Sequence, residues 1–142
     1  MNRLFLLIFL VFISCNDKDN KKGEEQATET EEFKMYSMSE MALLMEQMYV
    51  SNEQLREKII NQDSLGEMPN FFSKISTASL TDKSERDAFF NEKQFQFLAR
   101  QSLIYSTKDP KKAFNEMVDA CISCHTVKCG GPIARIKKLY IQ

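Results

Sequence analysis

The residues best suited to chemistry lie together near the C-terminal end of the chain, in the run Cys121-Ile122-Ser123-Cys124-His125. Two thiols three residues apart fall on one helical turn, and the imidazole beside them is the only His among 142 residues. This C-x-x-C-H pattern is typical of covalent haem attachment, in which both thiols bond to one porphyrin and the imidazole binds its iron. The sequence therefore predicts one haem c, with Cys121 and Cys124 in thioether bonds and His125 as the proximal iron ligand.

Two other chemistries compete for the same residues. Cys121 and Cys124 could form a disulfide or a redox dithiol, but the thioredoxin motif opens a helix after a strand, whereas this motif closes a predicted helix. A zinc site would need Cys121, Cys124, His125 and Cys129, with two ligands adjacent in sequence, which is unlike the usual paired knuckles. Haem is the preferred interpretation. Cys129 is then expected to be a small buried residue, with an intermolecular disulfide or a soft group near the haem edge as alternatives.

The overall composition excludes several classes of function. Nineteen Lys and Arg face twenty Asp and Glu, so the chain lacks the basic surface that nucleic-acid phosphates require. A single His rules out sites built from several imidazoles and leaves no second imidazole to act as a general acid or base. We therefore expect neither an enzyme nor a nucleic-acid partner.

The N-terminal segment is typical of an export signal. Residues 4–13 are an unbroken apolar run, and ten residues are too few to cross a bilayer as a helix. The run continues into residues 12–15, Phe-Ile-Ser-Cys, which resemble a bacterial lipobox. This pattern predicts cleavage before Cys15 and lipid attachment to Cys15, with an ordinary cleaved signal as the alternative.

The chain thus divides into three expected parts. Residues 1–14 form the lipoprotein signal peptide, and residues 15–33 form a lipidated, disordered linker because they hold almost no apolar side chains. Residues 34–142 form the folded domain. The protein is expected to be anchored in a membrane by its lipid and to face the periplasm or the cell surface of a bacterium.

Gly and Pro divide the domain into segments that favour helices. Turn signals occur at 66–69, 109–110 and 130–132, and no segment alternates long enough to be a strand. We expect a first helix from about Met38 to Asn61, opened by a capping box of Ser37 and Glu40. A shorter helix is expected at 69–77, a third from a cap within 81–86 to about 105, and a fourth opened by the pair Asp109-Pro110.

Apolar side chains repeat at helical spacing in each of these segments. The stripes comprise Met38, Met41, Met45, Met48, Leu55 and Ile59 around one polar residue, Asn52; Phe72 and Ile75; Phe90, Phe97 and Ile104; and Phe114, Val118, Cys121 and His125. Four amphipathic helices with short connections predict an all-α fold, an antiparallel four-helix bundle with covalent haem near the C-terminal end of the last helix.

A bundle with C-x-x-C-H at this place resembles the cytochrome c-prime family and its methionine-ligated, low-spin relatives. The resemblance covers about residues 34–142. The stretch from Met38 to Tyr49, the motif and the run Gly-Pro-Ile-Ala-Arg-Ile-Lys-Lys also look like a set of uncharacterised exported cytochrome-like lipoproteins. Two features depart from the family: the second helix is short, and the tail after His125 is long and carries Cys129 with a Gly-Gly-Pro turn.

The resemblance implies that the sixth iron ligand decides the function. Low-spin members place a Met of the first helix on the iron, and a His/Met pair suits an electron carrier. Cytochromes c-prime leave the iron five-coordinate and open to NO or CO. Because an antiparallel bundle puts the start of the first helix beside the motif, we expect Met45 as distal ligand and Met41 as the alternative, with Met38 fraying and Met48 too deep.

The tail after His125 is basic and contains no Asp or Glu. The resemblance implies that a basic residue here pairs with a haem propionate, and Arg135 and Lys138 are the candidates. A solvated helix end that complements its own dipole is the alternative. The expected partners are an unidentified redox protein and the membrane, and a homodimer is left open.

Overall fold

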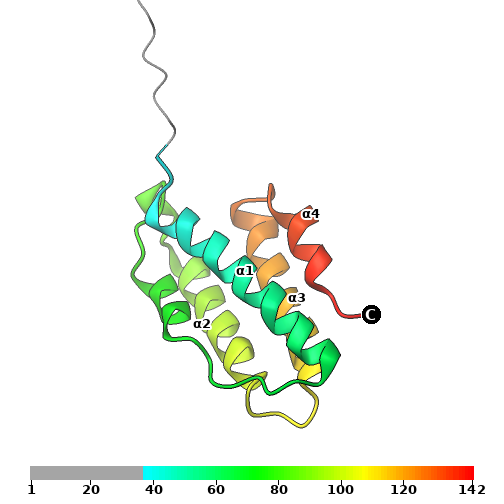
Figure 1. The fold of residues 1–142 in the computed structure, drawn as a ribbon. Coiled ribbons are helices and arrows are strands. Elements are labelled where there is room, and N and C mark those ends of the chain that lie inside the picture. Colours follow the sequence, from blue (N-terminus) through cyan, green and yellow to red (C-terminus); the bar gives the residue numbers. More distant parts are fainter. Residues whose placement is uncertain (1–36) are drawn as a thin grey trace, which may run out of the picture. The chain divides into compact units, whose positions relative to one another are not determined.

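The computed structural model describes residues 37–142, and in this part every regular element is helical. The all-α prediction is therefore confirmed for the described residues, while the signal peptide, Cys15 and the linker lie outside them. This part consists of three long helices and several short helical segments, whose arrangement can be followed in Figure 1. In chain order they are α1 (Glu40–Asn61), η1 (Asn70–Ser76), η2 (Lys83–Glu85), α2 (Ala88–Leu103), α3 (Pro110–Lys128), α4 (Ile133–Ile136) and η3 (Lys137–Leu139), where η denotes a 3-10 helix.

The long helices alternate only partly in direction. In Figure 1, α1 and α2 run the same way, α3 runs against both, and the segment after α3 turns back along it. Two hydrogen bonds join the Asn115 carboxamide to the backbone N–H and C=O of Ile141, both at 2.9 Å. None of the helices in residues 37–142 is long and apolar enough to cross a membrane.

The first helix begins two residues later than predicted. Ser39 is the N-cap, and its hydroxyl accepts the N–H of Ala42 at 3.2 Å. The predicted capping box of Ser37 and Glu40 is wrong, because the Glu40 carboxylate accepts the backbone N–H of Ser79 at 2.8 Å instead. A contact across 39 residues thus replaces the local one and ties the start of α1 to the chain ahead of α2.

The predicted second helix is a 3-10 helix rather than an α-helix. It spans the seven residues of η1. Pro69, which was expected to be its first residue, is its N-cap, so the helix begins one residue later than predicted. Phe72 and Ile75 are buried as predicted. Two anchors three residues apart suit the three-residue repeat of a 3-10 helix, which is rarely longer than this.

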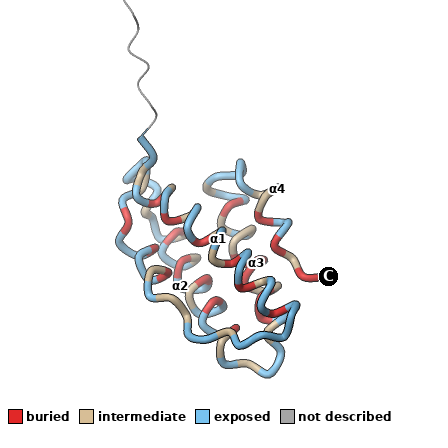
Figure 2. Tube along the Cα trace, in the orientation of Figure 1, coloured by how far each residue is buried: buried red, intermediate tan, exposed pale blue. Residues whose placement is uncertain are grey.

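The predicted cap of α3 is confirmed, whereas the predicted cap of α2 within residues 81–86 is wrong, because Asp87 caps that helix. Asp109 caps α3 by accepting the N–H of Lys112 at 3.0 Å, and Pro110 fills the first turn. Asp87 caps α2 in the same way through the N–H of Phe90. The core cluster contains most of the expected stripe residues, whose buried positions face inward in Figure 2, whereas Met38 is 39% exposed and lies outside it. Cys121 is only half-buried, which leaves it open to a cavity described below.

One buried polar contact joins α1 to α2. The Gln101 amide donates to the Asn52 side-chain oxygen at 3.0 Å, and both residues are almost fully buried. Asn52 was the single polar member of the predicted stripe of α1, and this bond explains how it is accommodated there. A hydrogen-bonded amide pair in an apolar interior fixes the register of the two helices, since shifting either helix would leave both groups unsatisfied.

Replacement of Phe114 by Ala is expected to destabilise the domain by about 3–5 kcal/mol. Its ring, in the second turn of α3, is completely buried, so truncation leaves a cavity that close-packed neighbours fill only in part. Urea unfolding followed by circular dichroism measures the loss. Phe95→Ala is the matched control, because this ring on α2 is 67% exposed and its loss should cost less than about 0.5 kcal/mol. Equal losses in the two variants would contradict the assignment of Phe114 to the core.

Candidate cofactor site

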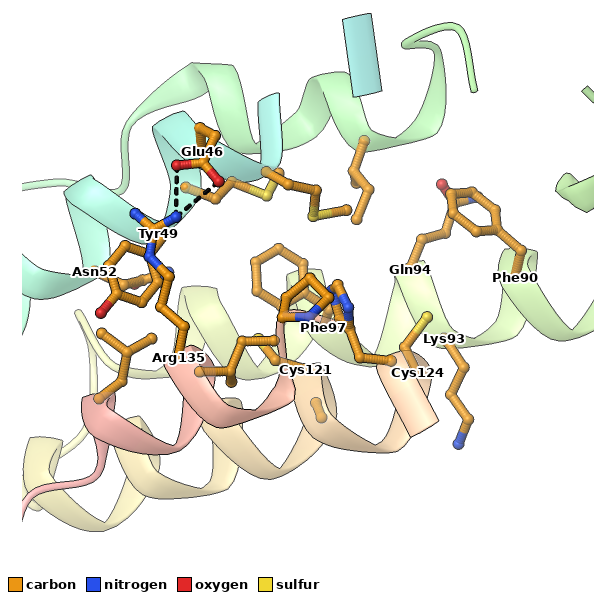
Figure 3. A pocket seen from close by; sticks show the side chains of 18 residues that line it. Glu46, Tyr49, Asn52, Phe90, Lys93, Gln94, Phe97, Cys121, Cys124 and Arg135 are labelled. Atoms are coloured by element: carbon orange, nitrogen blue, oxygen red, sulfur yellow. Dashed lines mark hydrogen bonds and ion pairs between the residues drawn. The ribbon is translucent and has the colours of Figure 1, made fainter. Parts of the chain in front are cut away.

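A pocket opens between α1, α2, α3 and the C-terminal segment. About 810 Å³ of empty space lies within it, counting the solvent at its open mouth. Its walls are mainly apolar, and Figure 3 shows side chains from all of these elements pointing toward it. The apolar walls include Met45, Met48, Phe90, Phe97, Ile136 and Leu139.

The three residues of the C-x-x-C-H motif that carry chemistry all line this pocket. Cys121, Cys124 and His125 come from the last two turns of α3, where helical spacing turns residues 121 and 125 to one face and residue 124 beside it. Cys121 and Cys124 are half-buried, and His125 is buried. The structure therefore brings together the three residues that the sequence singled out.

Across the pocket, α1 contributes two methionines. Met45 and Met48 line the cavity, as do Tyr49 and Asn52 on the same face of the helix. Met48, which was expected to lie too deep for the iron, is buried but reaches the wall of the cavity. Met41 is buried in the core without lining the pocket, because it lies one turn closer to the start of α1.

The C-terminal segment closes one end of the pocket with a charged cluster. The Arg135 guanidinium contacts both carboxylate oxygens of Glu46 at 2.7 and 2.8 Å and lies 3.8 Å above the ring of Tyr49. Figure 3 shows this cluster at the rim. Of the two predicted propionate partners, Arg135 lines the pocket, whereas Lys138 is exposed and does not.

The thiols of the motif are free and protonated. Burial raises the pKa of Cys121 to about 12, and burial together with the nearby Cys129 raises the pKa of Cys124. Cys121, Cys124 and Cys129 form no disulfide with one another. Among residues 37–142, no three His, Cys, Asp or Glu side chains are grouped closely enough to hold a metal ion.

His125 is held by the residue that ends its helix. Its Nδ1 lies 3.1 Å from the carbonyl oxygen of Cys129 and 3.2 Å from the sulfur of Cys129. Burial lowers the pKa of His125 below its ordinary value of 6.5 and so favours the neutral ring. Cys129 itself is exposed, and the expectation that it would be a buried apolar residue is wrong.

An ion-pair cluster fastens the motif end of α3 to the start of α2. The Lys128 ammonium contacts the carboxylates of Asp87 and Glu85, both at 2.6 Å. Hydrogen bonds from Lys128 and from the backbone N–H of Phe90 lower the pKa of Asp87 below its ordinary value of 3.8. Sequence analysis found the basic character of Lys128 but not its partners, which lie more than 40 residues away.

Replacing Asp87 by Asn is expected to destabilise the domain at pH 7 but not in strong acid. Asn caps a helix as well as Asp does, so the variant keeps the cap and loses only the charge. Because the folded-state pKa of Asp87 is depressed, its charge stabilises the fold above the unfolded-state pKa, and this contribution is lost as pH falls through the lower folded-state pKa. Urea unfolding of both proteins from pH 7 to pH 2.5 measures the difference between their free energies of unfolding, and this difference should shrink below about pH 4. An undiminished difference in the free energy of unfolding at pH 2.5 would contradict a stabilising role for the charge of Asp87.

Several pocket residues were missed by sequence analysis. Glu46 and Tyr49 seemed ordinary helix residues, and Gln94 was hidden among the aromatic residues of α2. Gln94 is 6% exposed, and its side-chain oxygen has no protein partner. A signal was available for Gln94, since it falls four residues after Phe90 and three before Phe97, on the buried face.

Comparisons with protein-family models, with curated proteins and with solved structures found no match for this chain. The resemblance to the cytochrome c-prime family therefore stays a prediction that depends on the motif and its position.

Proposed function

We propose that this chain is a lipid-anchored, monohaem c-type cytochrome that transfers electrons outside the cytoplasm of a bacterium. The observation that carries the proposal is the convergence of Cys121, Cys124 and His125 on one apolar pocket with Met45 opposite. Within the proposal the domain is a variant of the antiparallel four-helix bundle, in which η1 replaces the second helix.

The residues around the pocket suit a haem. Cys121 and Cys124 would hold it through thioether bonds, His125 and Met45 would bind the iron from α3 and α1, and Arg135 would pair with a propionate. A haem held there would supply an iron centre that takes up and releases one electron. The apolar walls exclude water, and a His/Met pair favours the reduced state, as an electron carrier needs.

The lipid anchor and the location are proposed from the sequence alone. The apolar run at 4–13 and Cys15 at its lipobox-like end support both. Export is consistent with the cofactor, because this kind of haem attachment takes place outside the cytoplasm. The redox partner is unidentified.

One observation favours a second candidate, a gas-binding haem protein with five-coordinate iron. The Gln94 side chain is buried against the pocket, and of its two amide N–H bonds one donates to the Asn91 side-chain oxygen at 3.2 Å, which leaves the other to donate to a small ligand. In this reading Met45 and Met48 would only pack against the ring.

Haem staining of a denaturing gel tests the proposal. The full chain, produced in a bacterium that can attach haem c, should give a stained band that survives boiling, since thioether bonds are covalent. A colourless band of the intact protein would overturn the proposal. Absorption spectra of the oxidised and reduced protein, with and without CO, then separate the two candidates: the electron carrier should be low-spin and slow to bind CO, and the gas-binding protein high-spin and quick to bind CO.

A further inference from the structure

The carboxyl end of α3 forms a tight turn around the imidazole of His125. Cys129 is the C-cap of the helix, with extended backbone angles of φ −154° and ψ 88°, and its backbone N–H donates to the carbonyl of His125 at 3.3 Å. The same residue brings its carbonyl oxygen to 3.1 Å and its sulfur to 3.2 Å from Nδ1 of the ring. Cys129 therefore contacts His125 through both its backbone and its side chain.

These contacts decide which ring nitrogen carries the proton. A neutral imidazole has one N–H and one lone pair, and a carbonyl oxygen can only accept a hydrogen bond. Nδ1 must then be the protonated nitrogen that donates to Cys129, with the sulfur as a second acceptor. Nε2 keeps its lone pair, which is the form in which an imidazole binds a metal.

We propose that Cys129 is the positioning residue of His125, whose carbonyl and thiol together hold the ring with Nδ1 protonated and Nε2 free for iron. This inference rests on the proposed function. It gives a role to the one Cys of the described residues that neither haem attachment nor a disulfide uses. Hydrogen bonds of this kind fix the orientation of a ligand and raise its basicity, and their loss elsewhere changes metal affinity or activity about 10–100-fold.

The first test needs no haem. Nitrogen-15 NMR of the His125 side chain in the full chain, produced without haem attachment, reports which nitrogen is protonated. We expect the tautomer with its proton on Nδ1 to be about ten times more populated than the tautomer with its proton on Nε2, as one well-formed hydrogen bond allows. Inserting one Ala between Lys128 and Cys129 turns both acceptors away from the ring, and the excess should disappear. The matched control inserts Ala between Gly130 and Gly131, which leaves Cys129 in place and should leave the excess unchanged.

The second test isolates the thiol in the haem-loaded protein. Cys129→Ala removes one hydrogen-bond acceptor and leaves the carbonyl. The ring then becomes a weaker electron donor to the iron, which stabilises the ferrous state relative to the ferric state. We expect about a threefold change in the ferric–ferrous equilibrium, or a rise of about 30 mV at 59 mV per tenfold for one electron. Cys129→Ser keeps an acceptor at this position and should stay near the native potential. A purely structural role for Cys129 would lower the melting temperature without moving the potential.

The outcomes separate this inference from the proposed function. A native ring protonated at Nε2, or a proton position that the first insertion leaves unchanged, overturns the positioning role whether or not haem is attached. Equal potentials in the native, Ala and Ser proteins overturn the role of the thiol. Absence of haem from the full chain overturns the proposed function, while the NMR result still decides the position of the proton.

Discussion

A chain in which Ser replaces both Cys121 and Cys124 is expected to carry no covalent haem. Each thiol lines the pocket and is unbonded to any other Cys of residues 37–142, so both are available to form thioethers. Ser keeps the size and polarity of the side chain but cannot form a thioether bond. Haem staining after boiling should fall from a full signal to none, and each single variant should keep one attachment and a weaker signal.

Cys129→Ser is the matched control for this loss. Cys129 lies five residues after Cys124 and does not line the pocket, so its replacement should leave the staining at the native level. Circular dichroism of the double variant tests whether it folds, because loss of haem from an unfolded chain would be uninformative. Undiminished staining of a folded double variant would rule out thioether attachment at the motif.

Replacing Met45 by Ala is expected to convert the low-spin haem protein to a high-spin form. Met45 lies across the pocket from His125, and its sulfur is the proposed sixth ligand. Without it the iron is open, so the reduced protein should bind CO readily, and its midpoint potential should fall because a His/Met pair favours the reduced state. Absorption spectra of both oxidation states, with and without CO, measure the change.

Met41 and Met48 provide the controls for Met45. Met41 is buried without lining the pocket, so Met41→Ala should keep the low-spin spectrum while lowering stability by about 2–5 kcal/mol through the cavity it leaves. Met48 also lines the pocket. Loss of the low-spin spectrum in Met48→Ala but not in Met45→Ala would move the ligand by one helical turn, and a high-spin native protein would favour the gas-binding candidate.

The methionines show what periodicity can and cannot predict. A heptad frame placed Met41, Met45 and Met48 on one face of a helix, and the structure places all three on the inner side. The frame has no information on where along the helix a cavity lies, because that depends on how far the partner helices extend. From the sequence, Met41 was therefore kept as a candidate iron ligand and Met48 was not. In the structure Met48 lines the pocket and Met41 does not.

Polar contacts over long distances in sequence were beyond prediction. The Glu40 carboxylate bonds to Ser79, Lys128 pairs with Asp87, and Arg135 reaches across 89 residues to Glu46. Each partner is an ordinary surface residue in its own helix or loop. Local propensity favoured a capping box at Glu40, but the carboxylate of Glu40 accepts the N–H of Ser79 instead.

By itself, the sequence determined the helical class, the boundaries set by Asp109-Pro110 and the grouping of Cys121, Cys124 and His125 on one turn. These features are local, since they depend on residues within four positions of one another along a helix. Only the tertiary structure decided that α1 presents Met45 and Met48 to that turn, that Arg135 lies at the rim, and that Cys129 contacts the His125 ring. Such placements depend on packing between distant helices and on the path of the turn after α3, which no local pattern encodes.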